Sequence, residues 1–313
     1  MGVLAWIGLG LFGAVLMAGG SRIALREVVA LSERMRLAKF VVGVTIVALG
    51  TDLPEIVNSI VSSRLGHGDV NLGDSIGSVL AQATLVLGLL PFATRRPLAI
   101  GRREVAGLAI ATVVLLGLGA ALASDGHVSR IDAALLIGGG LAALASSVRS
   151  SSGLEPDPPR SRTLRHPLQH AALAFAALAG VAAGATLLVR AVVATSLALG
   201  APEYALAFFA AALGTSLPEL VVNLTAMRRG ERAMALGGVL GACLLDASVS
   251  AGIGPLLFPT DVSSGAAIRG AAAAAAGTAL AAVALLGRGR HDRATGALLL
   301  TLYALALLSL VAR

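Results

Sequence analysis

Long apolar stretches separated by short polar connections run along the whole chain. We predict ten membrane-spanning helices, with bounds near 3–31, 38–65, 70–93, 103–124, 130–149, 167–197, 201–228, 232–257, 263–287 and 294–312. A helix needs about 20 apolar residues to cross the hydrocarbon core of a bilayer. The ten-residue alternation that is typical of membrane β-barrels is absent from the sequence. The predicted fold class is therefore all-α and polytopic.

The composition supports a chain that lies in lipid. It is 57% hydrophobic and 13% charged, whereas charged residues make up about a quarter of a soluble protein. The net charge of +7 does not indicate nucleic-acid binding, because the basic residues are not interleaved with stacking aromatics. The expected partners are the lipid bilayer and inorganic cations, with no nucleic acid and no obligate protein partner evident.

Basic residues are distributed unevenly between the connections. All but two of the Lys and Arg residues in the predicted loops lie in the odd-numbered ones, and the exceptions are Arg64 and Arg130. Cytoplasmic loops of membrane proteins carry an excess of Lys and Arg. We therefore expect the odd-numbered loops in the cytoplasm, both termini outside, and the chain in the inner membrane of the cell.

The sequence repeats itself at an offset of 164 residues. ALGTDLPEIV at 48–57 aligns with ALGTSLPELV at 212–221, and eight of the ten positions are identical. A polar linker at 150–166, expected in the cytoplasm, separates a first five-helix repeat (1–149) from a second (167–313). Because five spans are an odd number, the second repeat should enter the membrane inverted. Inverted repeats with interrupted helices are typical of secondary transporters.

Each copy of the repeat places a proline and a glutamate inside an otherwise apolar span. Pro54 and Pro218 have no amide hydrogen, so each should leave free the carbonyl four residues earlier. A threonine four residues before each glutamate shares its helical face. Carboxylate, hydroxyl and carbonyl oxygens are the ligands that hard cations such as Ca²⁺ prefer. The candidate ligands in the two motifs are Gly50, Thr51, Glu55, Gly214, Thr215 and Glu219. The alternative is a plain proline kink whose glutamate is neutral or paired with an arginine.

Three further carboxylates lie within or near the predicted spans. Asp246 lies well inside the eighth span, where an ionisable side chain is costly and usually functional. Asp52 stands beside the first kink, where the second repeat has Ser216. Asp74 is closer to the start of its span and could instead be an N-terminal helix residue near the interface. The histidines share no ligand spacing, so a zinc site is not expected.

The two motifs, extended to GTDLPEIVNS…LGDSIGSVLAQATLVLGL and GTSLPELVVN…LGGVLGACLLDASVSAGIG, resemble those of the sodium/calcium exchanger superfamily. The resemblance implies cation sites between the second, third, seventh and eighth helices, with the first and sixth helices sliding against that core. It implies that Glu55 and Glu219 are central ligands, with Thr51 and Thr215 beside them. Gln82 and Asp246 match the family's amide and carboxylate positions.

The chain departs from the family's usual pattern beside the kinks. Asp52 replaces a serine, and the residues next to the coupling-ion positions are Ser78 in one half and Ala242 in the other. We expect exchange of Ca²⁺ for Na⁺, and exchange of Ca²⁺ or another cation for H⁺ is the main alternative. A passive channel or a membrane enzyme is less expected, because no nucleophile–base pair or nucleotide-binding motif is present. No cofactor is expected, and the cations are substrates.

Overall fold

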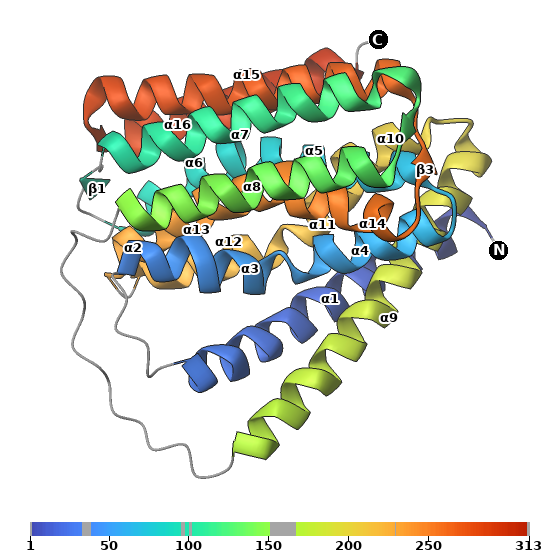
Figure 1. Ribbon diagram of the computed structural model, residues 1–313, viewed down its shortest axis with the longest axis horizontal. Coiled ribbons are helices and arrows are strands. Elements are labelled where there is room, and N and C mark those ends of the chain that lie inside the picture. The colour runs from blue at the N-terminus through green and yellow to red at the C-terminus, as the bar shows by residue number, and fades with distance from the viewer. Residues whose placement is uncertain are drawn as a thin grey trace.

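The computed structural model describes residues 2–32, 39–94, 98–99, 102–150, 167–228 and 230–311 (Figure 1). Helices make up nearly all of these ranges, together with four two-residue strands. The predicted linker, apart from Ser150 at its start, lies outside the described residues. The prediction of a nearly all-helical membrane protein is confirmed.

The first half of the chain contains a long helix, two broken spans and two straight helices. Its elements are α1 (Val3–Ser32), α2 (Lys39–Val42), η1 (Gly43–Val47), α3 (Ala48–Thr51), α4 (Leu53–Arg64), α5 (Gly68–Leu80), η2 (Ala81–Val86), α6 (Leu87–Leu89), η3 (Leu90–Ala93), β1 (Leu98–Ala99), α7 (Arg102–Leu122), η4 (Ala123–Asp125), β2 (His127–Val128) and α8 (Arg130–Ser150). The segments η1 and η2 are π-helical, and η3 and η4 are 3₁₀ turns.

The second half presents nearly the same series of elements. They are α9 (Pro167–Leu199), α10 (Glu203–Leu206), η5 (Ala207–Ala211), α11 (Ala212–Thr215), α12 (Leu217–Arg228), α13 (Arg232–Leu245), η6 (Asp246–Ser250), α14 (Ala251–Leu257), β3 (Thr260–Asp261), α15 (Ser264–Arg288), β4 (Arg290–His291) and α16 (Arg293–Val311). The segments η5 and η6 are π-helical. The run from η5 to α12 has the same bounds as the run from η1 to α4, displaced by 164 residues.

The prolines of the repeated motif break their helices at matching points. Asp52, with φ −73° and ψ 0°, separates α3 from α4, and Ser216, with φ −78° and ψ 6°, separates α11 from α12. In each case the proline then stands in the first turn of a new helix, where a missing amide hydrogen costs nothing. The axes before and after Asp52 differ by 42°. The sequence thus places a helix break next to each glutamate.

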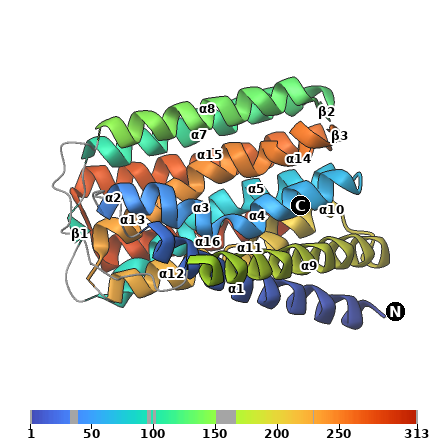
Figure 2. The same ribbon diagram turned by 60° about the horizontal axis from the view of Figure 1, so that its bottom comes forward.

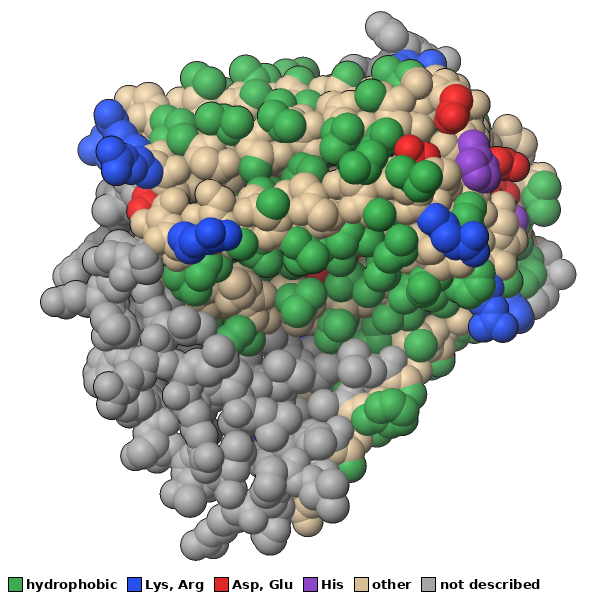
Figure 3. All heavy atoms as spheres, viewed as in Figure 1, with side chains coloured by type: hydrophobic (Ala, Val, Ile, Leu, Met, Phe, Trp, Pro, Cys, Tyr) green, Lys and Arg blue, Asp and Glu red, His purple; other side chains and the backbone are tan. Residues whose placement is uncertain are grey.

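The four short strands lie in the connections between helices and pair with one another at the two ends of the bundle. β1 pairs with β4 and β2 pairs with β3, both antiparallel, and the two pairs lie at opposite ends (Figure 1). Charged side chains gather at these ends, and apolar ones cover the band between them (Figure 3). Most of the described loop arginines belong to the β1–β4 end: Arg102, Arg103, Arg149, Arg228, Arg232, Arg288, Arg290 and Arg293. The β2–β3 end carries Arg64 and Arg130 with the carboxylates of Asp69, Asp125, Asp132, Glu203 and Asp261.

The lengths of the described helices fit a membrane protein. Eight helices are long and apolar enough to cross a bilayer, and the bent pair formed by Phe40–Thr51 and Leu53–Arg64 raises the count to nine. Arg293–Leu308 of α16 is apolar but shorter. These segments coincide with the predicted spans to within a few residues, except in α1 and α9. In those two helices only Val3–Gly20 and Phe175–Leu199 are counted as long and apolar enough to cross a bilayer.

Helices α1 and α9 form a pair of their own beside the rest of the bundle (Figure 2). A Cβ added at Gly13 would lie 2.7 Å from the carbonyl oxygen of Gly184, and one added at Gly184 would lie 2.6 Å from that of Gly13. Only glycine permits so close an approach of two backbones, as in small-residue contacts between membrane helices. The pair contacts the core through α3, α4, α11 and α12.

Candidate cation-binding site

Four broken segments pack against one another in the interior: α3–α4, α5–η2, α11–α12 and α13–η6. They bring together every side chain that the sequence singles out as a ligand. Each of these is no more than 3% exposed: Thr51, Asp52, Glu55, Ser78, Gln82, Thr215, Ser216, Glu219 and Asp246. Of the two glycines whose carbonyls were predicted to be free, Gly50 is buried, whereas Gly214 is half-buried and lies against Ala14 of α1.

The buried carboxylates of the two halves face one another. Asp52 interacts electrostatically with Asp246, Glu219 and Glu55, and Glu55 interacts with Glu219 and Asp246. Thr51 and Asp52 of the first half are direct neighbours of the Glu219 carboxylate. The buried polar residues of the described ranges include no Lys or Arg. This group of acids therefore has no described buried basic side chain to offset its charge.

Most oxygens of this group have no hydrogen-bond partner. They are both carboxylate oxygens of Asp52, Glu55 and Glu219, one of Asp246, the amide oxygen of Gln82 and the hydroxyl oxygen of Ser216. Buried polar atoms are nearly always paired, so each exception requires an explanation. A buried set of oxygens made up mainly of hydrogen-bond acceptors is suited to a hard cation.

Hydrogen bonds across the two halves orient several of these groups. Gln82 donates from Nε2 to Oδ2 of Asp246 over 2.9 Å, which leaves its amide oxygen free to accept. The hydroxyl oxygens of Ser78 and Thr215 are 3.4 Å apart. Thr51, in contrast, donates within its own half, to the carbonyl oxygen of Val47 over 3.0 Å. The contacts of Gln82 with Asp246 and of Ser78 with Thr215 therefore join candidate ligands of the two halves.

Asp74 does not lie in the first turn of its helix, because α5 begins at Gly68. It is 1% exposed and lies two turns inside α5. Its two oxygens accept hydrogen bonds from Oγ1 of Thr215 at 2.9 Å and from Nδ2 of Asn58 at 2.5 Å. Both oxygens thus have donors, unlike those of the glutamates. Asn58 was missed from the sequence, although it follows Glu55 by three residues and so shares its helical face.

Carboxylates alone do not complete a metal site here. Within the described ranges, no group of three or more His, Cys, Asp or Glu side chains could hold a metal ion by itself. An ion bound among these helices would need hydroxyl, amide or backbone oxygens as well, which are common ligands of Ca²⁺.

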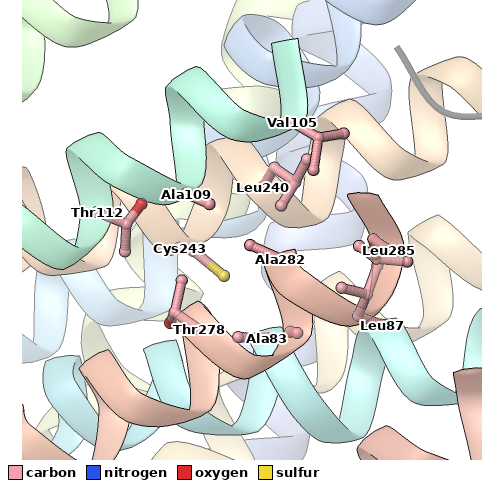
Figure 4. Close-up of a pocket in the computed structure, with 11 residues that line it drawn as sticks. Ala83, Leu87, Val105, Ala109, Thr112, Leu240, Cys243, Thr278, Ala282 and Leu285 are labelled. Carbon is pink, nitrogen blue, oxygen red and sulfur yellow. The ribbon is translucent and has the colours of Figure 1, made fainter. Parts of the chain in front are cut away.

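The single cysteine lines an apolar cavity together with side chains of α7 and α15 (Figure 4). Cys243 is buried there beside Thr112, Thr278 and Leu285. No charged side chain lines the cavity.

A comparison with protein families identifies the family of the chain. The model of the sodium/calcium exchanger protein family matches residues 5–145 and 170–312. The chain belongs to this family. It is therefore a multi-pass membrane antiporter of cations and not an enzyme, and the resemblance seen in its two motifs is confirmed.

Individual relatives agree with this assignment. An uncharacterized membrane protein of Methanocaldococcus jannaschii is 29% identical over 252 residues, which covers 80% of this chain and 82% of the relative. The sodium/calcium exchanger MaX1 of Methanosarcina acetivorans is 30% identical over 79 residues, 25% of this chain and 23% of the relative. A solved structure of the sodium–calcium exchanger NCX_Mj, soaked with 10 mM Na⁺ and without Ca²⁺, is 27% identical. It has a TM-score of 0.69, with 99% of this chain and all of that one covered.

Proposed function

We propose that this antiporter exchanges Ca²⁺ for Na⁺ across the cell membrane by alternating access. One observation carries the proposal: seven unpartnered carboxylate oxygens of Asp52, Glu55, Glu219 and Asp246 are buried together. Removing a cation from water is costly, and closely placed carboxylates offset that cost. A divalent ion gains most from two or more such groups.

Each ligand type has its own part in the proposed site. Glu55 and Glu219 hold the divalent ion from opposite sides, and Asp246 with the amide oxygen of Gln82 completes its shell. The hydroxyls of Thr51 and Thr215 and the carbonyls of Gly50 and Gly214 lie beside the helix breaks. Na⁺ ions bind next to the breaks, near Asp52 and Ser78 in one half and Ser216 in the other.

The proposed topology has ten spans in two inverted repeats, 1–149 and 167–313, joined by a cytoplasmic linker at 150–166. The repeated order of elements and the arginines of the β1–β4 end support this orientation, because basic ends face the cytoplasm. Both termini then lie outside. A cysteine at Ser124, exposed at the β2–β3 end, should react with an impermeant thiol reagent on intact cells in a Cys243→Ala background. One at Ser150 should not react, and reaction at Ser150 alone would reverse the orientation.

Exchange of Ca²⁺ for H⁺ is the second candidate, and Asp52 is the reason. The four buried carboxylates of the site, if all are ionised, exceed the charge of one Ca²⁺ by two, and no described buried Lys or Arg offsets the rest. The remaining charge requires further cations or protons, since unpaired buried charge is strongly unfavourable.

Proteoliposomes that contain the purified protein distinguish the two candidates. ⁴⁵Ca²⁺ uptake should follow an imposed outward Na⁺ gradient at constant pH. Uptake that follows only a pH gradient would show that the coupling ion is H⁺ and not Na⁺. Uptake that needs neither gradient and shows no counterflow would indicate a channel and contradict exchange.

A further inference from the structure

Two of the π-helical turns begin at candidate ligands of the cation site. In η2 the amide of Leu87 donates to the carbonyl oxygen of Gln82, and in η6 the amide of Ala251 donates to that of Asp246. Each bond spans five residues, whereas an α-helical bond spans four. The side chains of Gln82 and Asp246 are also hydrogen-bonded to each other. These two wide turns therefore begin at the pair of ligands that joins the two halves.

A hydroxyl group two residues further on is bonded into each wide turn. Oγ1 of Thr84 donates to the carbonyl oxygen of Leu80 over 2.5 Å, and Oγ of Ser248 donates to that of Leu244 over 2.6 Å. In an α-helix this carbonyl would accept the amide of the same Thr or Ser residue. A hydroxyl that bonds the carbonyl four residues earlier competes with the backbone and bends the helix. Each hydroxyl therefore favours the wide turn over the α-helical one.

Neither hydroxyl group is placed to bind the cation. Thr84 and Ser248 are fully buried, and each is two residues past its ligand, which is about 200° around the helix axis. A Cβ added at Gly277 of α15 would lie 3.4 Å from Cγ2 of Thr84, and the Ser248 hydroxyl fills the space beside Gly140 of α8. Both neighbours belong to helices outside the four broken segments. The two hydroxyls thus lie behind the ligands and act only on the backbone that carries them.

We propose that Thr84 and Ser248 are positioning residues, whose hydroxyl groups hold the wide turns that orient Gln82 and Asp246 towards the cation. This inference rests on the proposed cation exchange and adds two residues that act on the site without touching the ion.

The physical reason is the rotation that one extra residue introduces into a helix. Each residue of an α-helix accounts for about 100° around the axis. If a wide turn became α-helical, the parts of the helix before and after it would rotate against each other by about that angle. The bond of 2.9 Å between Gln82 and Asp246 would not survive such a rotation in either partner. Loss of one hydroxyl makes the α-helical turn competitive, so fewer molecules hold the ligands in place.

The other two π-helical segments, η1 and η5, contain no candidate ligand and offer a control. In η1, Oγ1 of Thr45 donates to the carbonyl oxygen of Val41 over 2.7 Å. The corresponding residue of η5 is Phe209, which has no hydroxyl group, and η5 is still π-helical. The hydroxyl thus occurs in both copies where the turn begins at a ligand, and in one copy where it does not. Thr45→Val should therefore leave cation binding unchanged.

A double-mutant cycle tests whether Thr84 acts through Gln82. The affinity of the purified protein for Ca²⁺ is measured by calorimetry in Thr84→Val, in Gln82→Ala and in the double variant, because residues that act as a unit give non-additive effects. Thr84→Ser keeps the hydroxyl, and Ser248→Ala removes the other one. Thr45→Val loses the same kind of bond and is the matched control.

We expect Thr84→Val and Ser248→Ala each to weaken Ca²⁺ binding about five- to tenfold, which corresponds to one net hydrogen bond. Thr84→Ser should bind like the unmodified protein, and Thr84→Val should change the affinity of Gln82→Ala less than about twofold. Unchanged affinity in Thr84→Val or Ser248→Ala would overturn the role of that residue. Additive effects in the cycle, or equal losses in Thr84→Ser and Thr84→Val, would overturn positioning by the hydroxyl.

A structure of Thr84→Val separates this inference from the proposed function. A five- to tenfold loss of affinity means that about a tenth to a fifth of the molecules keep the binding arrangement. In most molecules Gln82 should therefore lie beyond hydrogen-bond distance of Asp246, whichever cation is transported. Such a displacement in a protein whose unmodified form binds no Ca²⁺ would contradict the proposed function alone. Gln82 still bonded to Asp246 throughout would overturn the positioning role.

Discussion

The two halves of the cation site have the same helix breaks but unequal chemistry. Asp74 of the first half corresponds to Gly238 of the second, and a Cβ added at Gly238 would lie 2.4 Å from Oδ1 of Asn223. The amide of Asn223 therefore occupies the space beside Gly238. Asp52 likewise corresponds to Ser216, and Ser78 to Ala242.

Some features of the site are common to both repeats, and others are found in only one of them. Repetition provides two glutamates next to two helix breaks, which suits an ion held from both sides. The first half adds the carboxylates of Asp52 and Asp74, whereas the second has Ser216 and Gly238 at those positions and adds Asp246 where the first has Gln82. We therefore expect equal importance of Glu55 and Glu219, and unequal importance of almost every other matched pair.

The largest expected effect is that of replacing Glu55 or Glu219, the pair expected to be equally important. Glu55→Gln and Glu219→Gln each remove one charged ligand without changing the size of the side chain. Ca²⁺ exchange in proteoliposomes should fall at least about 100-fold in both variants, because the charge of the ligands sets Ca²⁺ affinity. Size-exclusion chromatography should show that both variants remain folded. Full exchange by either variant would contradict its assignment as a ligand.

Replacing Asp74 tests whether the hydrogen bonds that only the first half makes at this position stabilise the site. Asp74→Ala leaves the donors of Asn58 and Thr215 buried without a partner, which should cost about 2–4 kcal/mol of stability. The thermal midpoint in detergent should fall clearly, and exchange should fall because Thr215 loses its orientation. Asp74→Asn is the control, since its amide oxygen can still accept one hydrogen bond and should retain about half of that stability. Equal midpoints for Asp74→Ala and the unmodified protein would exclude this role.

Asp52 tests whether the extra charge selects the coupling ion. Asp52→Ser makes the first half like the second, and it should shift coupling towards Na⁺ and flatten the pH dependence of exchange between about pH 5 and 8. Ala242→Ser, which adds a hydroxyl to the other half, should strengthen Na⁺ coupling with less effect on the pH dependence. Exchange rates are measured against Na⁺ and pH. Curves of Asp52→Ser that overlay those of the unmodified protein on both axes would mean that Asp52 takes no part.

The smallest expected effect concerns two histidines that correspond between the halves. His291 is buried outside the spans, where its ring nitrogens are 2.8 Å from Oγ1 of Thr295 and 2.8 Å from the carbonyl oxygen of Leu87. Burial lowers the pKa of His291 from its ordinary value of 6.5. The unfolded chain then binds a proton that the folded protein does not, so stability is lost as the pH falls below about 6.5. His127, its counterpart, is 47% exposed.

The thermal midpoint should therefore fall by a few degrees between about pH 7 and pH 5.5, and it should fall less in His291→Gln, whose amide can still donate to Leu87. The unmodified protein, measured in the same buffers, is the control. An identical slope in His291→Gln would exclude His291 as the cause.

Much of the fold follows from local patterns. Hydrophobic length predicted the spans, and the prolines at 54 and 218 predicted the helix breaks, because both depend on neighbours within a few residues. The repeat at an offset of 164 predicted that the broken helices occur twice. The role of Asp74 could not be predicted, since position along a span does not show which side chains from other helices reach a carboxylate.

By itself, the sequence determined that this chain crosses a membrane, that it repeats, and that Glu55 and Glu219 stand beside helix breaks. These properties arise from apolar length, residue identity and the missing amide hydrogen of proline, all of which are local. Only the tertiary structure decided that Gln82 donates to Asp246, that Asp74 holds Thr215, and that the serines of α4 face α14. Those contacts join residues more than 130 positions apart, and their partners are fixed only when the two halves pack together.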